Sequence, residues 1–191
     1  MSERWESFYR TTPIEELPWE LDKADLEVVR AIEKGKVKIG KALDLGCGTG
    51  ANAVYLAEKG FTVTGIDISE TAIKHAKNRA RKAGVKCTFI VRDVLSIAFE
   101  DMFELVVDRG CFHHITPRLR ERFIENVYRA LKPQGKYQLM CFSDKKQLDY
   151  GNTFSIEDIK KYFSLRFKVI SMREVVHHEP AGRSVYLYSV F

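Results

Sequence analysis

The sequence predicts an α/β fold: a doubly wound, mostly parallel sheet with helices on both faces and an antiparallel last strand. Short apolar segments alternate with amphipathic helical segments along the chain. The last two apolar segments are joined by a short turn, so the final strand runs antiparallel to the one before it. The parallel strands of such a sheet point their carboxyl ends to one edge, where ligands bind.

The chain of 191 residues fits a single domain, which we divide into a helical leader, residues 1–40, and a Rossmann-like core, residues 41–191. The net charge of +5 permits an acidic partner without requiring one. No apolar run reaches the span of a membrane, and the first ten residues do not follow the signal-peptide pattern, so we expect a cytoplasmic protein. The four cysteines are widely spaced, which predicts reduced thiols and no zinc site: Cys47, Cys87, Cys111 and Cys141.

The core begins with a predicted buried strand, Lys41 to Leu45, followed by a glycine turn and a helix from Ala51 to Lys59. The turn reads D-x-G-x-G-x-G from Asp44 to Gly50, and no Lys-Ser or Lys-Thr pair follows it, which excludes a Walker phosphate loop. A dinucleotide fingerprint, G-x-G-x-x-A, is formally satisfied as well. Because a carboxylate repels a pyrophosphate and attracts a cation, Asp44 favours a nucleoside that carries an ammonium or sulfonium.

Two further acids follow the next strands. Asp67 ends the predicted strand Thr62 to Ile68, about 20 residues after the glycine turn, the separation expected of an acid that binds a ribose diol. Ser69 is the better helix cap, which leaves Asp67 available for a ligand. Asp93 follows the strand Cys87 to Arg92, where a carboxylate can meet an adenine edge. The intervening helix, residues 71–84, carries a basic face that we interpret as solvated.

The strand Phe103 to Val107 is almost wholly apolar and therefore predicted to be central. It leads into Asp108, Arg109 and the pair His113 and His114. The remaining predicted elements are a helix at Pro117 to Leu131, a strand at Lys136 to Phe142, a functional loop at Ser143 to Thr153, a capped helix at Ser155 to Phe163, and strands at Phe167 to Val176 and Arg183 to Phe191, joined by a turn at residues 177–182.

The leader is predicted to contain two helices, Ser2 to Arg10 and Asp22 to Lys34, joined by a segment with two prolines. Its aromatic density is the highest in the chain. We expect Trp5 to pack on the core, whereas Tyr9 and Trp19 are candidates for a lid, because aromatic faces attract a sulfonium.

The glycine stretch, the acids Asp67, Asp93 and Asp108, and the closing hairpin together resemble the class I S-adenosylmethionine-dependent methyltransferases over nearly the whole chain. This resemblance implies a seven-stranded sheet of order 3-2-1-4-5-7-6. The leader and Asp108-Arg109-Gly110 resemble the small-molecule branch with thiopurine, thiol, halide and tellurite methyltransferases, whereas Phe112 to Ile115 is more similar to quinone-biosynthesis enzymes. Substrate class stays open between these.

The resemblance also implies roles for individual residues toward S-adenosylmethionine, whose product is S-adenosylhomocysteine. Gly46, Gly48 and Gly50 would admit the methionine portion, with Asp44 holding its ammonium directly or through water. Asp67 would accept from both ribose hydroxyls, and Asp93 from the adenine amine. The other implied contacts are Ile68 and Val94 against the adenine, Asp108 near the methionine end or the methyl, and Tyr9 and Trp19 over the cofactor.

The sulfonium is an activated donor, so alignment of the reactants in a dry pocket supplies much of the acceleration. A hydroxyl or protonated amine would also need a base, for which His114 is the first candidate and His113 the second. An equally supported interpretation is that the histidine is structural, at a helix start and hydrogen-bonded to the backbone. His177 and His178 are expected to be solvated. No third ligand accompanies either histidine pair, which argues against a metal.

The expected partner is a small-molecule acceptor, and the basic helix lacks the interleaved aromatics that stack on bases, which argues against nucleic acid. The alternatives are an RNA or protein methyltransferase, which usually adds a recognition domain or an Asn-Pro-Pro-Tyr motif, a nicotinamide oxidoreductase, and a non-catalytic module that binds S-adenosylmethionine. Oligomeric state is not readable from the sequence.

Overall fold

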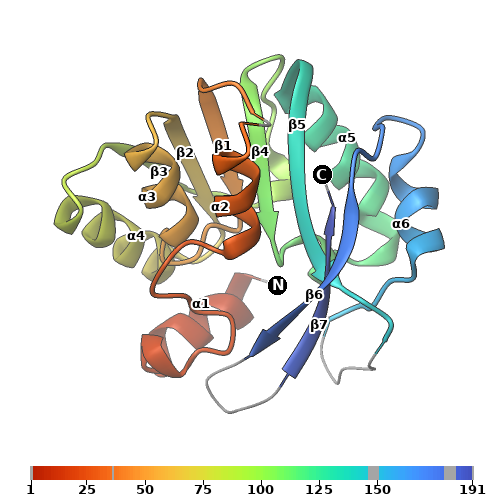
Figure 1. The fold of residues 1–191 in the computed structure, drawn as a ribbon. Helices are drawn as coiled ribbons and strands as arrows, with labels where there is room; N and C mark the ends of the chain where they lie inside the picture. Colours follow the sequence, from red (N-terminus) through yellow and green to blue (C-terminus); the bar gives the residue numbers. More distant parts are fainter. Residues whose placement is uncertain (1, 36, 146–150, 179–183, 191) are drawn as a thin grey trace.

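A computed structural model describes residues 2–35, 37–145, 151–178 and 184–190. These residues form one seven-stranded sheet in the predicted order, β3-β2-β1-β4-β5-β7-β6 (Figure 1). The first five strands pair in parallel, and β7 runs antiparallel to both β5 and β6. The strands are β1 Lys41–Leu45, β2 Thr62–Asp67, β3 Cys87–Val91, β4 Phe103–Arg109, β5 Leu131–Phe142, β6 Met172–His178 and β7 Ser184–Val190.

Helices cover both faces of the sheet, as predicted (Figure 1). The α-helices are α1 Ser2–Thr11, α2 Leu26–Glu33, α3 Ala51–Glu58, α4 Glu70–Lys82, α5 Arg120–Ala130 and α6 Ile156–Phe163. Short 3-10 turns occur at η1 Ile14–Glu16, η2 Val94–Ser96, η3 Phe112–His114 and η4 Pro117–Leu119. One apolar cluster packs α2, α3 and α4 against the sheet, and a second contains buried residues of α5 and α6. The central strands β1 and β4 are therefore buried on both faces.

Three predicted boundaries differ from the structure. The second leader helix begins at Leu26 and not at Asp22, because the Asp25 side chain accepts a hydrogen bond from the Glu27 N–H and caps the helix there. The strand predicted from Lys136 begins earlier, because β5 starts at Leu131 and accommodates a positive φ of 65° at Gln134. The strand predicted from Phe167 begins only at Met172.

The carboxyl-terminal hairpin also differs from the prediction. His177 and His178 belong to strand β6 and not to the turn, because β6 pairs with β7 through these positions. Residues 146–150 of the predicted functional loop lie outside the described residues, as do residues 179–182 of the predicted turn and residue 183 of the predicted last strand. The capped helix is confirmed: the Ser155 hydroxyl accepts from the Asp158 N–H, and the Asp158 carboxylate accepts from the Ser155 N–H.

The leader folds back on the core, with α1 lying beside the carboxyl edge of the sheet (Figure 1). The Glu6 carboxylate on α1 accepts hydrogen bonds from the Ser69 hydroxyl at 2.7 Å and the Thr71 hydroxyl at 2.6 Å. These bonds tie α1 to the start of α4. In the described part of the chain, none of the helices has the length and apolar character needed to cross a membrane.

Candidate active site

A cavity of about 190 Å³ opens at the carboxyl edge of the sheet. Ten of the residues proposed from the sequence line this one cavity, which brings together segments from the leader, the glycine turn and the ends of five strands. These residues are Tyr9, Trp19, Gly46, Gly48, Asp67, Ile68, Asp93, Val94, His113 and His114. Asp44, Gly50 and Asp108 do not line it.

The glycine turn has left-handed backbone at three positions, with φ of 62° at Gly46, 52° at Gly48 and 84° at Gly50. A Cβ on Gly48 would lie 2.8 Å from the Tyr9 hydroxyl, so this glycine lets the backbone approach the lid. A Cβ on Gly50 would instead lie 3.0 Å from the Ala76 Cβ. Gly50 therefore permits close packing of α3 on α4, and it does not line the cavity.

Asp67 ends β2 with its side chain fixed at the cavity wall. One carboxylate oxygen accepts from the Gly48 N–H and the other from the Ser69 N–H, each at 2.9 Å. Burial raises the pKa of Asp67, and these backbone hydrogen bonds oppose the rise. Each oxygen has a second lone pair, so the carboxylate can still accept from a diol.

Asp93 and its neighbours form the adjacent wall. The Asp93 carboxylate caps the short turn η2 by accepting from the Leu95 N–H at 2.8 Å. Val94 follows in that turn and is buried, and Ile68 lies at the end of β2. These residues present apolar surface and one carboxylate side by side, an arrangement that can receive a planar base.

Asp44 lies beneath the cavity in β1 and is 1% exposed. Burial raises its pKa to about 8, with the charges of Asp108 and Asp67 adding to the shift. Its Oδ2 has no hydrogen-bond partner among the described residues. A buried carboxylate oxygen without a donor is unfavourable, so this atom is suited to an ammonium group or to a water that bridges to one.

Asp108 organises the chain after β4 and does not reach into the cavity. Its carboxylate accepts from the Cys111 N–H at 2.7 Å, from the Phe112 N–H, and from the Tyr137 hydroxyl at 2.9 Å. The side chain is fully buried, which raises its pKa to about 7. The direct contact with the methionine end or the methyl group that we expected is therefore not supported by this geometry.

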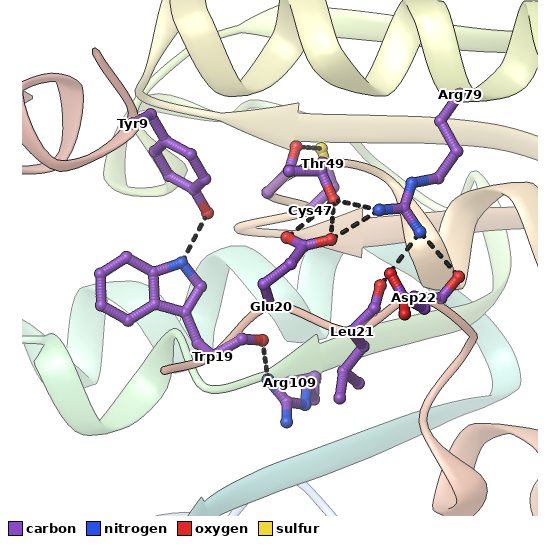
Figure 2. Close-up of polar contacts among 10 residues, drawn as sticks. Tyr9, Trp19, Glu20, Leu21, Asp22, Cys47, Thr49, Arg79 and Arg109 are labelled. Atoms are coloured by element: carbon purple, nitrogen blue, oxygen red, sulfur yellow. Dashed lines mark hydrogen bonds and ion pairs between the residues drawn. The ribbon is translucent and has the colours of Figure 1, made fainter. Parts of the chain in front are cut away.

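The predicted lid residues are in contact with each other. The indole N–H of Trp19 donates to the Tyr9 hydroxyl at 2.9 Å, and the Arg109 guanidinium donates to the Trp19 carbonyl at 2.7 Å (Figure 2). Arg109 also forms an ion pair with Asp25 at 3.1 Å. The lid is thereby anchored to the end of β4. Trp5, expected to pack on the core, lines the cavity as well.

A partly buried polar cluster that the sequence did not reveal attaches the leader to the glycine turn (Figure 2). The Glu20 carboxylate accepts from the Thr49 hydroxyl at 2.7 Å and from Arg79 at 2.5 Å. The other guanidinium nitrogen of Arg79 donates to the carbonyls of Leu21 and Asp22, both at 3.0 Å. Arg79 was predicted to face solvent with the other basic residues of α4, and instead it faces the leader.

The histidines after β4 lie close together at the cavity. His113 and His114 approach through their Nε2 atoms at 3.1 Å. His177, expected to be solvated, also lines the cavity, where its Nε2 faces the Arg109 guanidinium at 3.3 Å. Across the described residues, no group of three or more His, Cys, Asp or Glu side chains is placed to hold a metal ion.

This geometry defines a nucleoside-binding α/β enzyme. The Asp67 carboxylate can accept hydrogen bonds from a ribose, and the wall beside Asp93 can receive a base. The unpaired oxygen of buried Asp44 and the close backbone approach at Gly48 fit a cationic amino-acid portion. The residues present therefore fit S-adenosylmethionine, which carries all three groups.

The comparisons with known proteins identify the family. A methyltransferase domain model matches residues 42–135. The 2-heptyl-1-hydroxyquinolin-4(1H)-one methyltransferase of Mycobacteroides abscessus is 36% identical over 148 residues, covering 74% of this chain and 65% of that protein. The probable thiol methyltransferase 2 of Arabidopsis thaliana is 30% identical over 159 residues, covering 81% and 70%. The chain belongs to the S-adenosylmethionine-dependent methyltransferases, and S-adenosylmethionine is its cofactor.

A solved structure confirms the fold independently. The protein described in work on the conversion of a disulfide bond into a thioacetal group during echinomycin biosynthesis matches 100% of this chain and 91% of its own, with a TM-score of 0.87 and 24% identity. At this identity the match shows the shared fold. The alignment with the Mycobacteroides relative spans 65% of that protein, just under two thirds of its length.

Proposed function

We propose that this enzyme transfers the methyl group of S-adenosylmethionine to a small acceptor with an apolar, ring-like body. The observation that carries this proposal is the division of the cavity along the sheet. The β3-β2-β1 half contributes Asp93, Asp67 and the glycine turn to the cavity, whereas the β4-β5-β7 half contributes His114, Phe142 and Leu187. The first half suits the nucleoside, and the second leaves an apolar chamber for an acceptor.

The acceptor chamber is built from aromatic and aliphatic side chains. Trp5 lies against His114 with ring centroids 4.8 Å apart, and Phe142 stacks on His113 at 3.6 Å. Met140, Val185 and Leu187 complete the apolar wall. Such a chamber excludes water and orients a flat apolar molecule, which fits a reaction that depends on alignment.

The proposed cofactor contacts follow from the same geometry. Bound S-adenosylmethionine supplies an activated methyl group on a sulfonium. Asp67 would bind the ribose, Asp93 the adenine edge, and Asp44 the ammonium directly or through a water. Tyr9 and Trp19 would cover the nucleoside and exclude solvent.

The names of the two relatives agree with this acceptor class, since one acts on a hydroxyquinolone and the other is named for thiols. Both names indicate small-molecule acceptors. The experiment is incubation of the protein with methyl-labelled S-adenosylmethionine and separate acceptors: aromatic thiols, hydroxylated heterocycles, quinols, amines and RNA. We expect label on a small heterocycle or thiol. Transfer only to RNA, or tight cofactor binding without any transfer, would contradict the proposal.

We also propose a cytoplasmic location, supported by four cysteines that the structure holds as separate free thiols, and a partner set of small molecules without nucleic acid. The basic side chains Lys74, Lys77, Arg81 and Lys82 of α4 are exposed, as a solvated face requires. Fractionation of cells that express the tagged chain tests the location, and a filter-binding titration with RNA tests the partner.

A further inference from the structure

His113 is held in one tautomer by the backbone of β5. Its buried ring stacks on Phe142 at an interplanar angle of 12°, and its Nδ1 lies 3.3 Å from the Phe142 N–H. A backbone N–H can only donate, so Nδ1 is the acceptor and carries no proton. A neutral imidazole has one proton, which in His113 is therefore on Nε2.

This assignment determines the tautomer of His114. The two Nε2 atoms are 3.1 Å apart, and only His113 has a proton to place between them. His113 donates and His114 accepts through Nε2, so the remaining proton of neutral His114 is on Nδ1. Burial lowers the pKa of His113 well below its usual value and that of His114 to about 4, so both rings are neutral near pH 7.

The outer nitrogen of His114 is available to a ligand. Its Nδ1 forms no hydrogen bond with any described residue and is not among the fully buried polar atoms that lack a partner. The ring lines the cavity beside Trp5. Arg4 of α1 raises the positive potential at His114, and Arg109, with His177 of β6 against it, acts in the same direction on His113.

We propose that His113 and His114 form a tautomer-locked pair in which His114 is a hydrogen-bond donor to the acceptor and His113 is the residue that positions it. The proposal rests on the methyl-transfer function proposed above. The lone pair of His114 Nε2 is occupied by His113, so His114 is not the free base that the sequence suggested. The substrate class follows: an acceptor that arrives as an anion, such as an acidic hydroxyl or thiol on an apolar ring.

The methyl transfer to an anionic acceptor balances in atoms and charge without a base on the enzyme. The anionic oxygen or sulfur of the acceptor forms a bond to the methyl carbon while the carbon–sulfur bond of the sulfonium breaks. The sulfur keeps that electron pair and becomes a neutral thioether, and the acceptor becomes a neutral ether or thioether. No proton is released, so the site needs no group that accepts one. This agrees with His114, whose Nδ1 can only donate.

The tautomers can be measured without any acceptor. Long-range ¹H–¹⁵N spectra of the protein with S-adenosylhomocysteine should show His113 protonated at Nε2 and His114 at Nδ1 throughout pH 6–8. In His113→Asn, the side-chain oxygen can still accept from the Phe142 N–H, but the donor to His114 is lost. We expect His114 to become a mixture of tautomers there. His114 protonated at Nε2 in the parent protein would overturn the proposal, whatever the acceptor proves to be.

Kinetics test the substrate class. Along a series of heteroaromatic thiols and hydroxyls of graded acidity, the pH at which kcat/KM rises should follow the pKa of each acceptor. A single inflection between pH 6 and 8, shared by all acceptors, would show a base on the enzyme and contradict the proposal.

Asn carries its amide near the position of Nδ1 and Gln near that of Nε2, so His114→Gln should be at least tenfold slower than His114→Asn.

These outcomes separate the two proposals. Correct tautomers without turnover of any acceptor would leave the histidine pair standing and refute the proposed methyl transfer. Turnover with the shared inflection would leave the methyl transfer standing and refute the donor role. S-adenosylhomocysteine binding and thermal unfolding of each variant establish that it is folded.

Discussion

Arg79→Met tests whether the leader is held over the site by the cluster of Glu20, Thr49 and Arg79. The substitution removes all four hydrogen bonds that the guanidinium makes to the leader and the glycine turn. It leaves the Glu20 carboxylate, whose side chain is 8% exposed, with Thr49 as its remaining donor. Breaking a buried pair on one side costs about 3–5 kcal/mol, and because Arg79 is 25% exposed we expect the lower end, about 3 kcal/mol.

The pH dependence of this loss has a definite sign. Burial already raises the pKa of Glu20, and the charge of Arg79 opposes that rise. Without Arg79 the pKa rises further, so the folded variant binds a proton more readily than the unfolded chain. Stability from such a group is present at low pH and is lost as pH increases through the folded pKa. The destabilisation by Arg79→Met should therefore be smaller at pH 5 than at pH 8.

The assay is urea unfolding at both pH values, with S-adenosylhomocysteine titrations at pH 8. Arg81→Met is the matched control, because Arg81 is exposed on the same helix and bonds weakly, at 3.5 Å, to Asn78. We expect Arg79→Met to lose about 3 kcal/mol and to bind the nucleoside at least fivefold more weakly, since the lid is less well held. A difference below about 0.5 kcal/mol between the two variants would refute the reasoning.

Three further predictions concern the lid and the glycine turn. Tyr9→Phe removes the acceptor of the Trp19 N–H and should lower stability by about 1 kcal/mol in thermal unfolding. Gly50→Ala places a Cβ 3.0 Å from the next helix at φ 84°, whereas Gly84→Ala, at φ 69°, meets open space. Urea unfolding should therefore show a loss of about 2 kcal/mol for the first and about 1 kcal/mol for the second; equal losses would contradict the packing role. Asp44 has a raised folded pKa of about 8, so parent stability should fall as pH rises from 5.5 to 7.5, by up to about 1.4 kcal/mol per pH unit, and Asp44→Asn should flatten that slope.

The parts of the site that the sequence predicted are those encoded by local pattern. Asp67 ends β2 and Asp93 lies just beyond β3, and the carboxyl ends of parallel strands meet at one edge. The glycine turn follows from three glycines in seven residues. The lid pair Tyr9 and Trp19 could be predicted because aromatic residues are concentrated in the leader.

The parts that sequence could not supply depend on contacts between distant residues. Glu20 and Arg79 are 59 positions apart, and Arg79 lies in a run of basic residues that otherwise faces solvent. The sequence could not show whether Asp108 is free to contact a ligand. In the structure its carboxylate accepts hydrogen bonds from the Tyr137 hydroxyl and the Cys111 N–H. His177 was misplaced because register with β7, and not local composition, decides where β6 ends.

The central claim is that the cavity at the carboxyl edge binds the nucleoside of S-adenosylmethionine through Asp67. Isothermal titration calorimetry with S-adenosylhomocysteine tests it most directly, using Asp67→Ala and, as a control, Glu100→Ala, whose side chain is 66% exposed outside this cavity. Far-UV circular dichroism establishes that both variants are folded. We predict one molecule bound per chain, a loss of at least tenfold in affinity for Asp67→Ala, and parent affinity for Glu100→Ala. Parent affinity in Asp67→Ala would contradict the account.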